Sequence, residues 1–359
     1  MSDAPLIVLG VRRSGTTLLR VMLDRASTLA IPDESYFVPQ LARRHAGTVD
    51  PDAFVDDLRR LPTLVEWGLP PAVVAPRLRA GMSTGEAIAA IFAAYASERG
   101  KPRWGDKTPR YMQHLPLLER LFPTACFIHL IRDGRDAALS FLAVPPGIMT
   151  KGWGYPRDAQ GFACQWATEV RAARALGARV GAPRYHEVRY ETLVADPEAE
   201  LRHVCRLAAL VYDPEMLGYV GQTDSARKEH QQRLNDPPRV GVRDWRTEMA
   251  PADVTAFEAV AGDLLDELGY PVSPAGRRDR RRLVAYEAKT RAWRAVGAVT
   301  QRSPLWRRRH PILGPPPVSD TGGQAADRPL SVSVGDSRVS ARATAARPCR
   351  RTRRGSRSG

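Results

Sequence analysis

Residues 6–23 read LIVLGVRRSGTTLLRVML, and this stretch decides the fold. The apolar run Leu6–Val11 is typical of a buried strand in a parallel sheet. Apolar residues at helical spacing then predict an amphipathic helix over Thr17–Ser27. The segment between them, Gly10–Thr17, has the outline of a phosphate-binding loop. Its glycines let the backbone curl, and the following helix presents N–H groups and a positive dipole end to an anion.

The charges of this loop distinguish it from an ATP-binding loop. The Walker pattern requires Gly-Lys-Ser/Thr, whereas Thr16 stands at the lysine position. The positive charge is on Arg12 and Arg13 instead, which favours a 5′-phosphate group over a clamp for β- and γ-phosphates. Two alternatives stay open from this loop alone: a glycine turn that binds no ligand, and a P-loop nucleotide kinase or NTPase.

A second predicted strand is also followed by a charged turn. Residues Ala125–Ile131 form the strand, and the run RDGRDAALS, residues 132–140, comes directly after it. Ligands of open α/β sheets bind outside the carboxyl ends of the strands, so both loops are expected to border one crevice. Arg132 and Ser140 can then hold a separate phosphate. Taken alone, the run RDGRD is also typical of a solvated turn with internal ion pairs.

The alternation of strands and helices predicts the fold class. Further strands are expected at Leu29–Ile31 and Tyr185–Tyr190, and helices in the Ala-rich stretch 50–100 and at Pro197–Leu210. This pattern predicts an α/β protein, a P-loop-like three-layer sandwich with a mainly parallel sheet that is covered on both faces.

The net charge of +15 is confined to the end of the chain. Residues 277–359 hold 21 Lys+Arg against 5 Asp+Glu, whereas residues 1–276 hold 33 and 34. We therefore expect a catalytic domain at 1–276, a basic helical extension at 277–318 and a disordered basic tail at 319–359. The basic end can contact an anionic surface or nucleic acid, which leaves a non-catalytic binder as a further alternative. A solvated terminal helix is the simpler interpretation of the extension.

Cysteine content and the first residues bear on the compartment. The four cysteines form no CxxC pair and no zinc-binding spacing with histidine, so three of them are expected to be small core residues in a reducing compartment. The apolar run before Arg12 spans only six residues, 6–11, which predicts neither a signal peptide nor a transmembrane segment. The expected location is the cytoplasm.

Four motifs, in a fixed order, resemble those of the PAPS-dependent sulfotransferase superfamily. RRSGTT (12–17) resembles its 5′-phosphosulfate loop, and RDGRDAALS (132–140) resembles its 3′-phosphate loop. WGDKTP (104–109) is similar to its Lys-Thr-Pro segment, and RYETL (189–193) is similar to its Tyr-Glu-x-Leu stretch. The likeness covers residues 5–270.

The resemblance implies PAPS as co-substrate, adenosine 3′,5′-bisphosphate (PAP) as product, and no metal. The residues that it implies for donor binding are Arg12, Arg13, Ser14, Gly15, Thr16, Thr17, Arg132, Ser140 and Tyr190. Sulfuryl transfer resembles phosphoryl transfer in its loose, in-line transition state, so cations must neutralise the developing charge. Arg13 and Lys107 are the predicted cations, and a surface lysine is the alternative interpretation of Lys107.

The predicted general base is Glu34, in the stretch IPDES (31–35). Its distance from the loop resembles that in the protein-tyrosine sulfotransferase branch, where a glutamate serves as base. An exposed acidic turn is the alternative, and His114 and His129 are other candidates, although His129 fits a core position better.

The acceptor is expected to be a hydroxyl on a small molecule, glycan or lipid. The membrane anchor and paired cysteines of the tyrosine-specific branch are not evident in this sequence.

Two further segments are expected to close over the bound molecules. The Pro/Gly-rich stretch 144–155 can form a lid over an acceptor through Trp153 and Tyr155. The stretch RVGVRDWR (239–246) resembles the family's closing segment over the donor.

Overall fold

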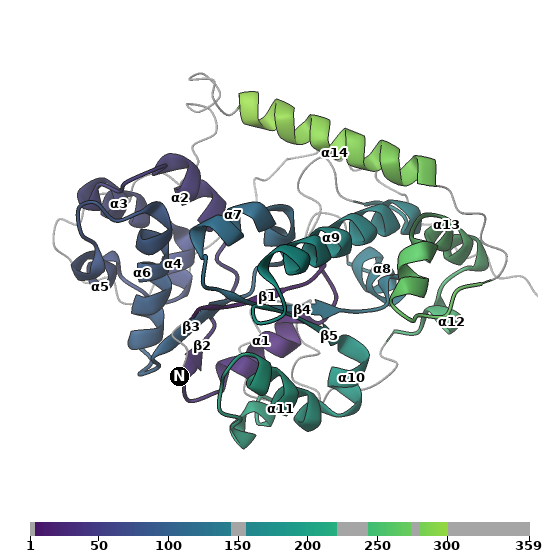
Figure 1. The fold of residues 1–359 in the computed structure, drawn as a ribbon, viewed down its shortest axis with the longest axis horizontal. Helices are drawn as coiled ribbons and strands as arrows, with labels where there is room; N and C mark the ends of the chain where they lie inside the picture. Colours follow the sequence, from purple (N-terminus) through teal and green to yellow (C-terminus); the bar gives the residue numbers. More distant parts are fainter. Residues whose placement is uncertain (1–3, 145–155, 221–242, 274–279, 301–359) are drawn as a thin grey trace, which may run out of the picture. The chain divides into compact units, whose positions relative to one another are not determined.

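The computed structural model describes residues 4–144, 156–220, 243–273 and 280–300 (Figure 1). Its sheet has five parallel strands in the order β2-β3-β1-β4-β5. The strands are β1 (Leu6–Leu9), β2 (Leu29–Ala30), β3 (Arg103–Asp106), β4 (Cys126–Ile131) and β5 (Tyr185–Arg189). The predicted parallel sheet is confirmed, with strands at or within two residues of the four predicted ranges.

The register of β1 and β4 brings the two predicted loops to the same edge of the sheet. Leu6 pairs with Cys126 and Leu9 with His129, so both strands end side by side. Their loops therefore start from neighbouring strands, as the sequence predicted.

Strand β3 was not predicted. Its sequence, RWGD, has neither an apolar run nor an alternating pattern. It inserts between β1 and β2, and Gly105 pairs with Leu6. A Cβ atom at Gly105 would lie 2.6 Å from the Leu6 carbonyl oxygen, so this glycine permits the close approach.

Helices cover both faces of the sheet. Those of four residues or more are α1 (Thr16–Asp24), α2 (Val38–Arg44), α3 (Pro51–Leu58), α4 (Pro62–Glu66), α5 (Pro71–Val74), α6 (Thr84–Ser97), α7 (Leu115–Leu121), α8 (Gly134–Leu142), α9 (Ala159–Val180), α10 (Tyr190–Ala195), α11 (Pro197–Leu207), α12 (Trp245–Glu248), α13 (Pro251–Glu267) and α14 (Arg280–Thr300). Short 3₁₀-helices occur at Ala75–Arg77, Pro109–Gln113 and Pro214–Leu217.

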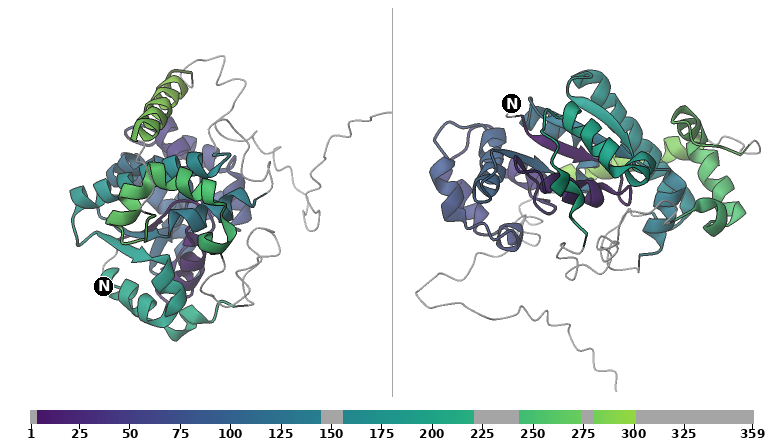
Figure 2. Two further views of the ribbon diagram at one scale, coloured as in Figure 1. Left: turned by 90° about the vertical axis from the view of Figure 1, so that its right-hand side faces the viewer. Right: turned by 90° about the horizontal axis from the view of Figure 1, so that it is seen from below.

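The sheet separates two hydrophobic cores. Leu6 and Val8 of β1 face a core built with α1, α10 and α11, whereas Ile7 and Leu9 face one built with α6, α7, α9 and α13. Figures 1 and 2 show α11 and α13 on opposite sides of the sheet. Because successive side chains of a strand point to opposite faces, an unbroken apolar run such as LIVL fits a strand buried on both sides. The predicted three-layer sandwich is confirmed.

The end of the described chain is the helix α14, which lies within the predicted basic extension. Its Leu283 is buried in the core that contains α9 and α13. The predicted tail, 319–359, lies outside the described residues.

Cys126, Cys164 and Cys205 are buried and not disulfide-bonded, as expected for core cysteines. Across the part of the chain that the structure describes, every helix is too short or too polar to cross a bilayer.

Candidate active site

The loop between β1 and α1 curls through two left-handed residues. Arg13 has φ 71° and Gly15 has φ 90°, while the Ser14 N–H donates to the Val11 carbonyl at 3.1 Å. A Cβ atom at Gly15 would lie 2.4 Å from the Tyr190 ring, so glycine is required there for space as well as for conformation. Among the residues that the structure describes, no side chain caps the N-terminus of α1. Its first N–H groups are therefore available to an anion.

The two predicted phosphate loops meet. Arg13 Nε donates to Ser140 Oγ at 3.0 Å, although the two residues are 127 positions apart. Arg132 donates to the Arg13 carbonyl at 3.3 Å and lies 4.4 Å above the Tyr190 ring. Tyr190 thus contacts Gly15 of one loop and Arg132 of the other. The structure places residues of three sequence motifs in one cluster.

The run RDGRD is buried, so its interpretation as a solvated turn is wrong. Arg132 is 6% exposed and Arg135 is fully buried. The internal ion pair does exist: Arg135 binds Asp133 at 2.7 Å, and it also binds Glu258 of α13 at 2.6 Å. Because Glu258 lies more than 120 residues downstream, nothing in the local sequence indicates this partner.

Lys107 is fully buried, so its interpretation as a surface lysine is also wrong. Its Nζ donates to Thr17 Oγ1 at 3.2 Å and to Glu34 Oε1 at 2.6 Å. Burial lowers the pKa of Lys107, while the Glu34 carboxylate opposes that shift. Glu34 keeps 17% of its side chain exposed, and its Oε2 accepts from the Tyr36 hydroxyl. A buried ammonium and a partly exposed carboxylate therefore lie beside the phosphate-binding loop.

The two histidines are placed differently. His129 is fully buried in β4, its Nδ1 lies 2.6 Å from the Tyr185 hydroxyl, and burial lowers its pKa to about 3. It is a core residue, as expected. His114 is partly exposed at the start of α7.

Part of the predicted closing segment docks beside the second loop. The Trp245 N–H donates to Asp136 Oδ1 at 2.8 Å, and the Arg135 guanidinium lies 3.7 Å above the Trp245 ring. This attaches α12 to the start of α8. Residues 239–242 of that segment, and residues 145–155 of the predicted lid, lie outside the described residues.

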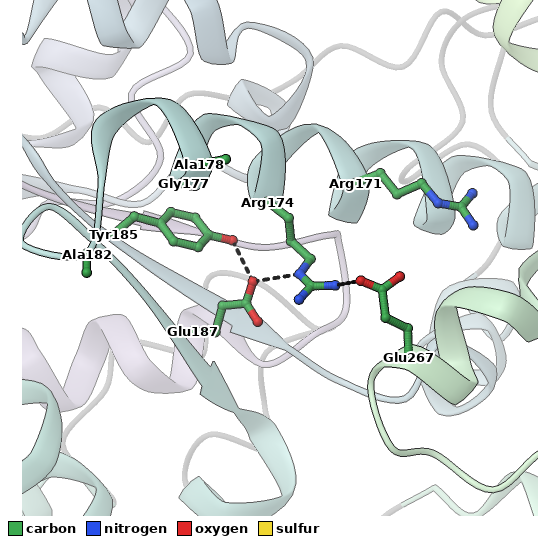
Figure 3. Close-up of a pocket in the computed structure, with 8 residues that line it drawn as sticks. All are labelled: Arg171, Arg174, Gly177, Ala178, Ala182, Tyr185, Glu187 and Glu267. Atoms are coloured by element: carbon green, nitrogen blue, oxygen red, sulfur yellow. Dashed lines mark hydrogen bonds and ion pairs between the residues drawn. The ribbon is translucent and has the colours of Figure 1, made fainter.

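An open pocket of about 500 Å³ lies elsewhere, over α9 and β5. Figure 3 shows Arg174 between Glu187 and Glu267, with the Tyr185 hydroxyl directed at Glu187. It shares no residue with the predicted site. Both carboxylates of the pocket already pair with Arg174, and the pocket lies away from the predicted site, so we assign it no role in the reaction. Among the residues that the structure describes, no group of three or more His, Cys, Asp and Glu side chains is arranged to hold a metal ion.

Comparison with known proteins agrees with the geometry. Residues 5–214 match the Sulfotransferase family. The chain is 31% identical to nodulation protein NoeE of Sinorhizobium fredii, over 82% of this chain and 73% of that protein. It is 26% identical to protein-tyrosine sulfotransferase A of Caenorhabditis elegans, over 73% of this chain and 66% of that protein. The chain thus spans about two thirds to three quarters of these relatives.

The fold also matches a solved structure. The sulfotransferase domain from the curacin biosynthetic pathway superposes with a TM-score of 0.55 at 20% identity, covering 76% of this chain and 99% of that domain. Fold, loops and sequence together place this chain in the sulfotransferase family. As a member, it is a PAPS-dependent transferase that moves a sulfuryl group to a hydroxyl-bearing acceptor. The alternatives of a nucleotide kinase and of a non-catalytic binder are not favoured.

Proposed function

We propose that this chain transfers the sulfuryl group where the phosphate-binding loop, Lys107 and Glu34 meet. The observation that supports this proposal is the pair of bonds made by Lys107 Nζ, to Thr17 Oγ1 at 3.2 Å and to Glu34 Oε1 at 2.6 Å. One buried ammonium touches both the donor-binding loop and a carboxylate. This is the arrangement that a transferase needs to bring a leaving phosphate and a general base together.

In the proposed reaction, the acceptor oxygen bonds to sulfur as the bond from sulfur to the bridging phosphate oxygen breaks. The hydroxyl proton passes to Glu34, and PAP leaves with an additional negative charge. Arg13 and Lys107 neutralise that charge. Because a carboxylate oxygen accepts two hydrogen bonds, Glu34 Oε2 can accept from the acceptor as well as from Tyr36.

For the donor, we assign the 5′-phosphate to the first loop and the 3′-phosphate to the second. Ser14, Gly15, Thr16 and Thr17 hold the former with Arg12 and Arg13, and Arg132 and Ser140 hold the latter. The contact between Arg13 and Ser140, at 3.0 Å, supports a single nucleotide reaching both loops. Tyr190 supports both loops from its position between Gly15 and Arg132.

For the acceptor, we propose a hydroxyl of a small molecule, glycan or lipid. A protein tyrosine is the second candidate, favoured by the 26% identity to a protein-tyrosine sulfotransferase. Incubating the chain with labelled PAPS and a cell extract, with and without protease digestion, distinguishes them by mass spectrometry. Products of low mass that gain one sulfuryl group support the first candidate, and sulfated tryptic peptides support the second.

A cytoplasmic location and the domain boundaries at 276 and 318 stay predictions.

Replacing the proposed base tests the mechanism. Glu34→Gln removes the proton acceptor but keeps the shape of the side chain, so turnover should fall by about 100-fold or more. The affinity for PAP, measured by calorimetry, should stay within about two-fold, because Glu34 is not assigned to the donor. Glu66→Gln, at an exposed position of α4, is the matched control and should keep full activity. Unchanged turnover in Glu34→Gln would remove Glu34 as the base.

A further inference from the structure

Four buried side chains next to the Glu34–Lys107 pair form one hydrogen-bond network. Ser35, Asp106, Thr108 and Tyr111 are each at most 2% exposed. Ser35 Oγ lies 2.8 Å from Asp106 Oδ1 and 2.7 Å from the Tyr111 hydroxyl, and Thr108 Oγ1 lies 3.2 Å from Asp106 Oδ1. The network joins the segment after β2 to the segment after β3.

The donor and the acceptor of each bond in the network can be assigned from the hydrogens available. Tyr111 accepts from the Val38 N–H at 3.1 Å, so its own hydrogen is available to Ser35 Oγ. Ser35 in turn donates to Asp106 Oδ1. Thr108 accepts from the Ser35 N–H at 3.0 Å and donates to the same oxygen of Asp106. Each hydroxyl hydrogen is used once, and both chains of bonds end on the Asp106 carboxyl.

The network fixes a strained turn at Tyr36, through the residues on either side of it. Tyr36 has φ 52°, a left-handed conformation that is costly for a bulky side chain. The Phe37 N–H closes the turn on the Ser35 carbonyl at 2.6 Å. Such a conformation is costly and persists only where its surroundings enforce it. Here the bonds to Ser35 and to the Val38 N–H enforce it from either side.

Each proposed catalytic residue directly adjoins a member of the network. Glu34 precedes Ser35, and Lys107 follows Asp106, so one set of bonds fixes both backbones. The second carboxyl oxygen of Asp106, Oδ2, is buried and makes no hydrogen bond to any residue that the structure describes, so Ser35 and Thr108 both bond to Oδ1.

We propose that Asp106, Ser35 and Tyr111 are positioning residues for sulfuryl transfer. They hold the turn at Tyr36 so that the Glu34 carboxylate meets the Lys107 ammonium beside the phosphate-binding loop. This inference rests on the role of Glu34 proposed above. The three residues touch neither donor nor acceptor, and they act through the placement of the base.

The test uses variants that delete single hydroxyls. Tyr111→Phe and Ser35→Ala should each lower the initial rate of transfer from radiolabelled PAPS into a cell extract by about ten-fold or more, because small displacements of a base are costly. The KM for PAPS and the affinity for PAP should stay within about two-fold, which also shows that the variants are folded. Tyr185→Phe removes the hydroxyl of another tyrosine, one bonded to His129 in the core. It should keep the wild-type rate.

Two substitutions of Asp106 test whether its hydrogen-bond acceptor is what matters. Asp106→Asn keeps a carbonyl oxygen that can accept from Ser35 and Thr108, so it should retain more activity than Asp106→Ala. The proposal is overturned if Tyr111→Phe and Ser35→Ala keep the full rate while Glu34→Gln is impaired. It is also overturned if they lose rate and PAP affinity in equal proportion, which indicates general unfolding. Full activity in Glu34→Gln would instead overturn the base itself, and this inference with it.

Discussion

At the scale of single residues, the site depends on a cation that the fold removes from water. Lys107 is fully buried, and a buried ammonium is stable only when it is paired and hydrogen-bonded. Glu34 and Thr17 provide those partners at 2.6 and 3.2 Å. The same contacts that oppose the loss of the Lys107 proton also place its ammonium between the loop that follows β1 and the proposed base, Glu34. Its stability and its proposed function therefore have one cause.

Arginine substitutions test the donor site. Arg13→Ala and Arg132→Ala should each weaken PAP binding by about 10- to 100-fold, because each removes a charge-assisted hydrogen bond that we propose the arginine makes to a phosphate of the donor. Calorimetric titration with PAP measures this effect. Arg59→Ala removes an exposed arginine that pairs with Asp56, and it should bind PAP as the wild type does. Wild-type affinity in both Arg13→Ala and Arg132→Ala would show that the donor binds elsewhere.

At the scale of elements, the second loop is held by a contact between distant helices. Arg135 at the start of α8 bonds Asp133 in its own loop and Glu258 of α13, with all three side chains almost completely buried. Asp133 also receives support from its backbone N–H, which donates to Glu191 of α10 at 2.9 Å. The loop that carries Arg132 is therefore fixed by α10 and α13, neither of which belongs to its own strand and helix.

Replacing Glu258, the partner of Arg135 on α13, should lower the free energy of unfolding. Glu258→Gln leaves a buried guanidinium without part of its counter-charge, and breaking a buried ion pair typically costs about 3–5 kcal/mol. Urea unfolding followed by circular dichroism measures the free energy of unfolding. As a comparison, Glu198→Gln breaks an exposed i,i+4 pair with Arg202 and should cost about 0–1 kcal/mol. Equal free energies of unfolding for the two variants would show that the buried pair of Arg135 and Glu258 does not stabilise the fold.

At the scale of the whole molecule, buried titratable groups make stability depend on pH. Burial raises the pKa of Asp106 from 3.8 to about 7, while Lys107 and the hydroxyls of Ser35 and Thr108 oppose the shift and Glu34 adds to it. Between these two values the folded chain binds the Asp106 proton and the unfolded chain does not. The contribution of Asp106 to stability is therefore present below pH 4 and is lost as the pH rises through 7.

An amide at this position should remove that dependence. Asp106→Asn cannot ionise, so its free energy of unfolding relative to the wild type should rise as the pH is increased from about 4 to about 8. Urea titrations at several pH values measure the difference. Asp56→Asn, on the exposed side of α3, should show a far smaller pH-dependent difference. A difference for Asp106→Asn that stays constant across this range would show that Asp106 has an ordinary pKa in the folded protein.

Prediction from the sequence succeeded where one segment carries its own signal. The run LIVL, the glycines of the loop and the apolar spacing of α1 lie within 20 residues of one another, and the pattern RDGRD directly follows the apolar strand β4. It failed at β3, whose RWGD has no apolar pattern, and it left the burial of Lys107 open. Asp106 lies within the motif WGDKTP. Its partner Ser35 and the tyrosine bonded to Ser35, Tyr111, had no signal in the sequence that linked them to it.

Local residue types were enough to predict the layered α/β fold, the two loops that border the candidate site and the family, because backbone conformation and strand burial follow from them. Which charged side chains are buried, and which partners they pair with, became visible in the folded chain alone. Lys107 with Glu34, Arg135 with Glu258 and Ser35 with Asp106 are separated by about 70 to 120 residues. The free energy of such pairs depends on desolvation and distance, and both are set only when strands and helices from remote parts of the chain pack together.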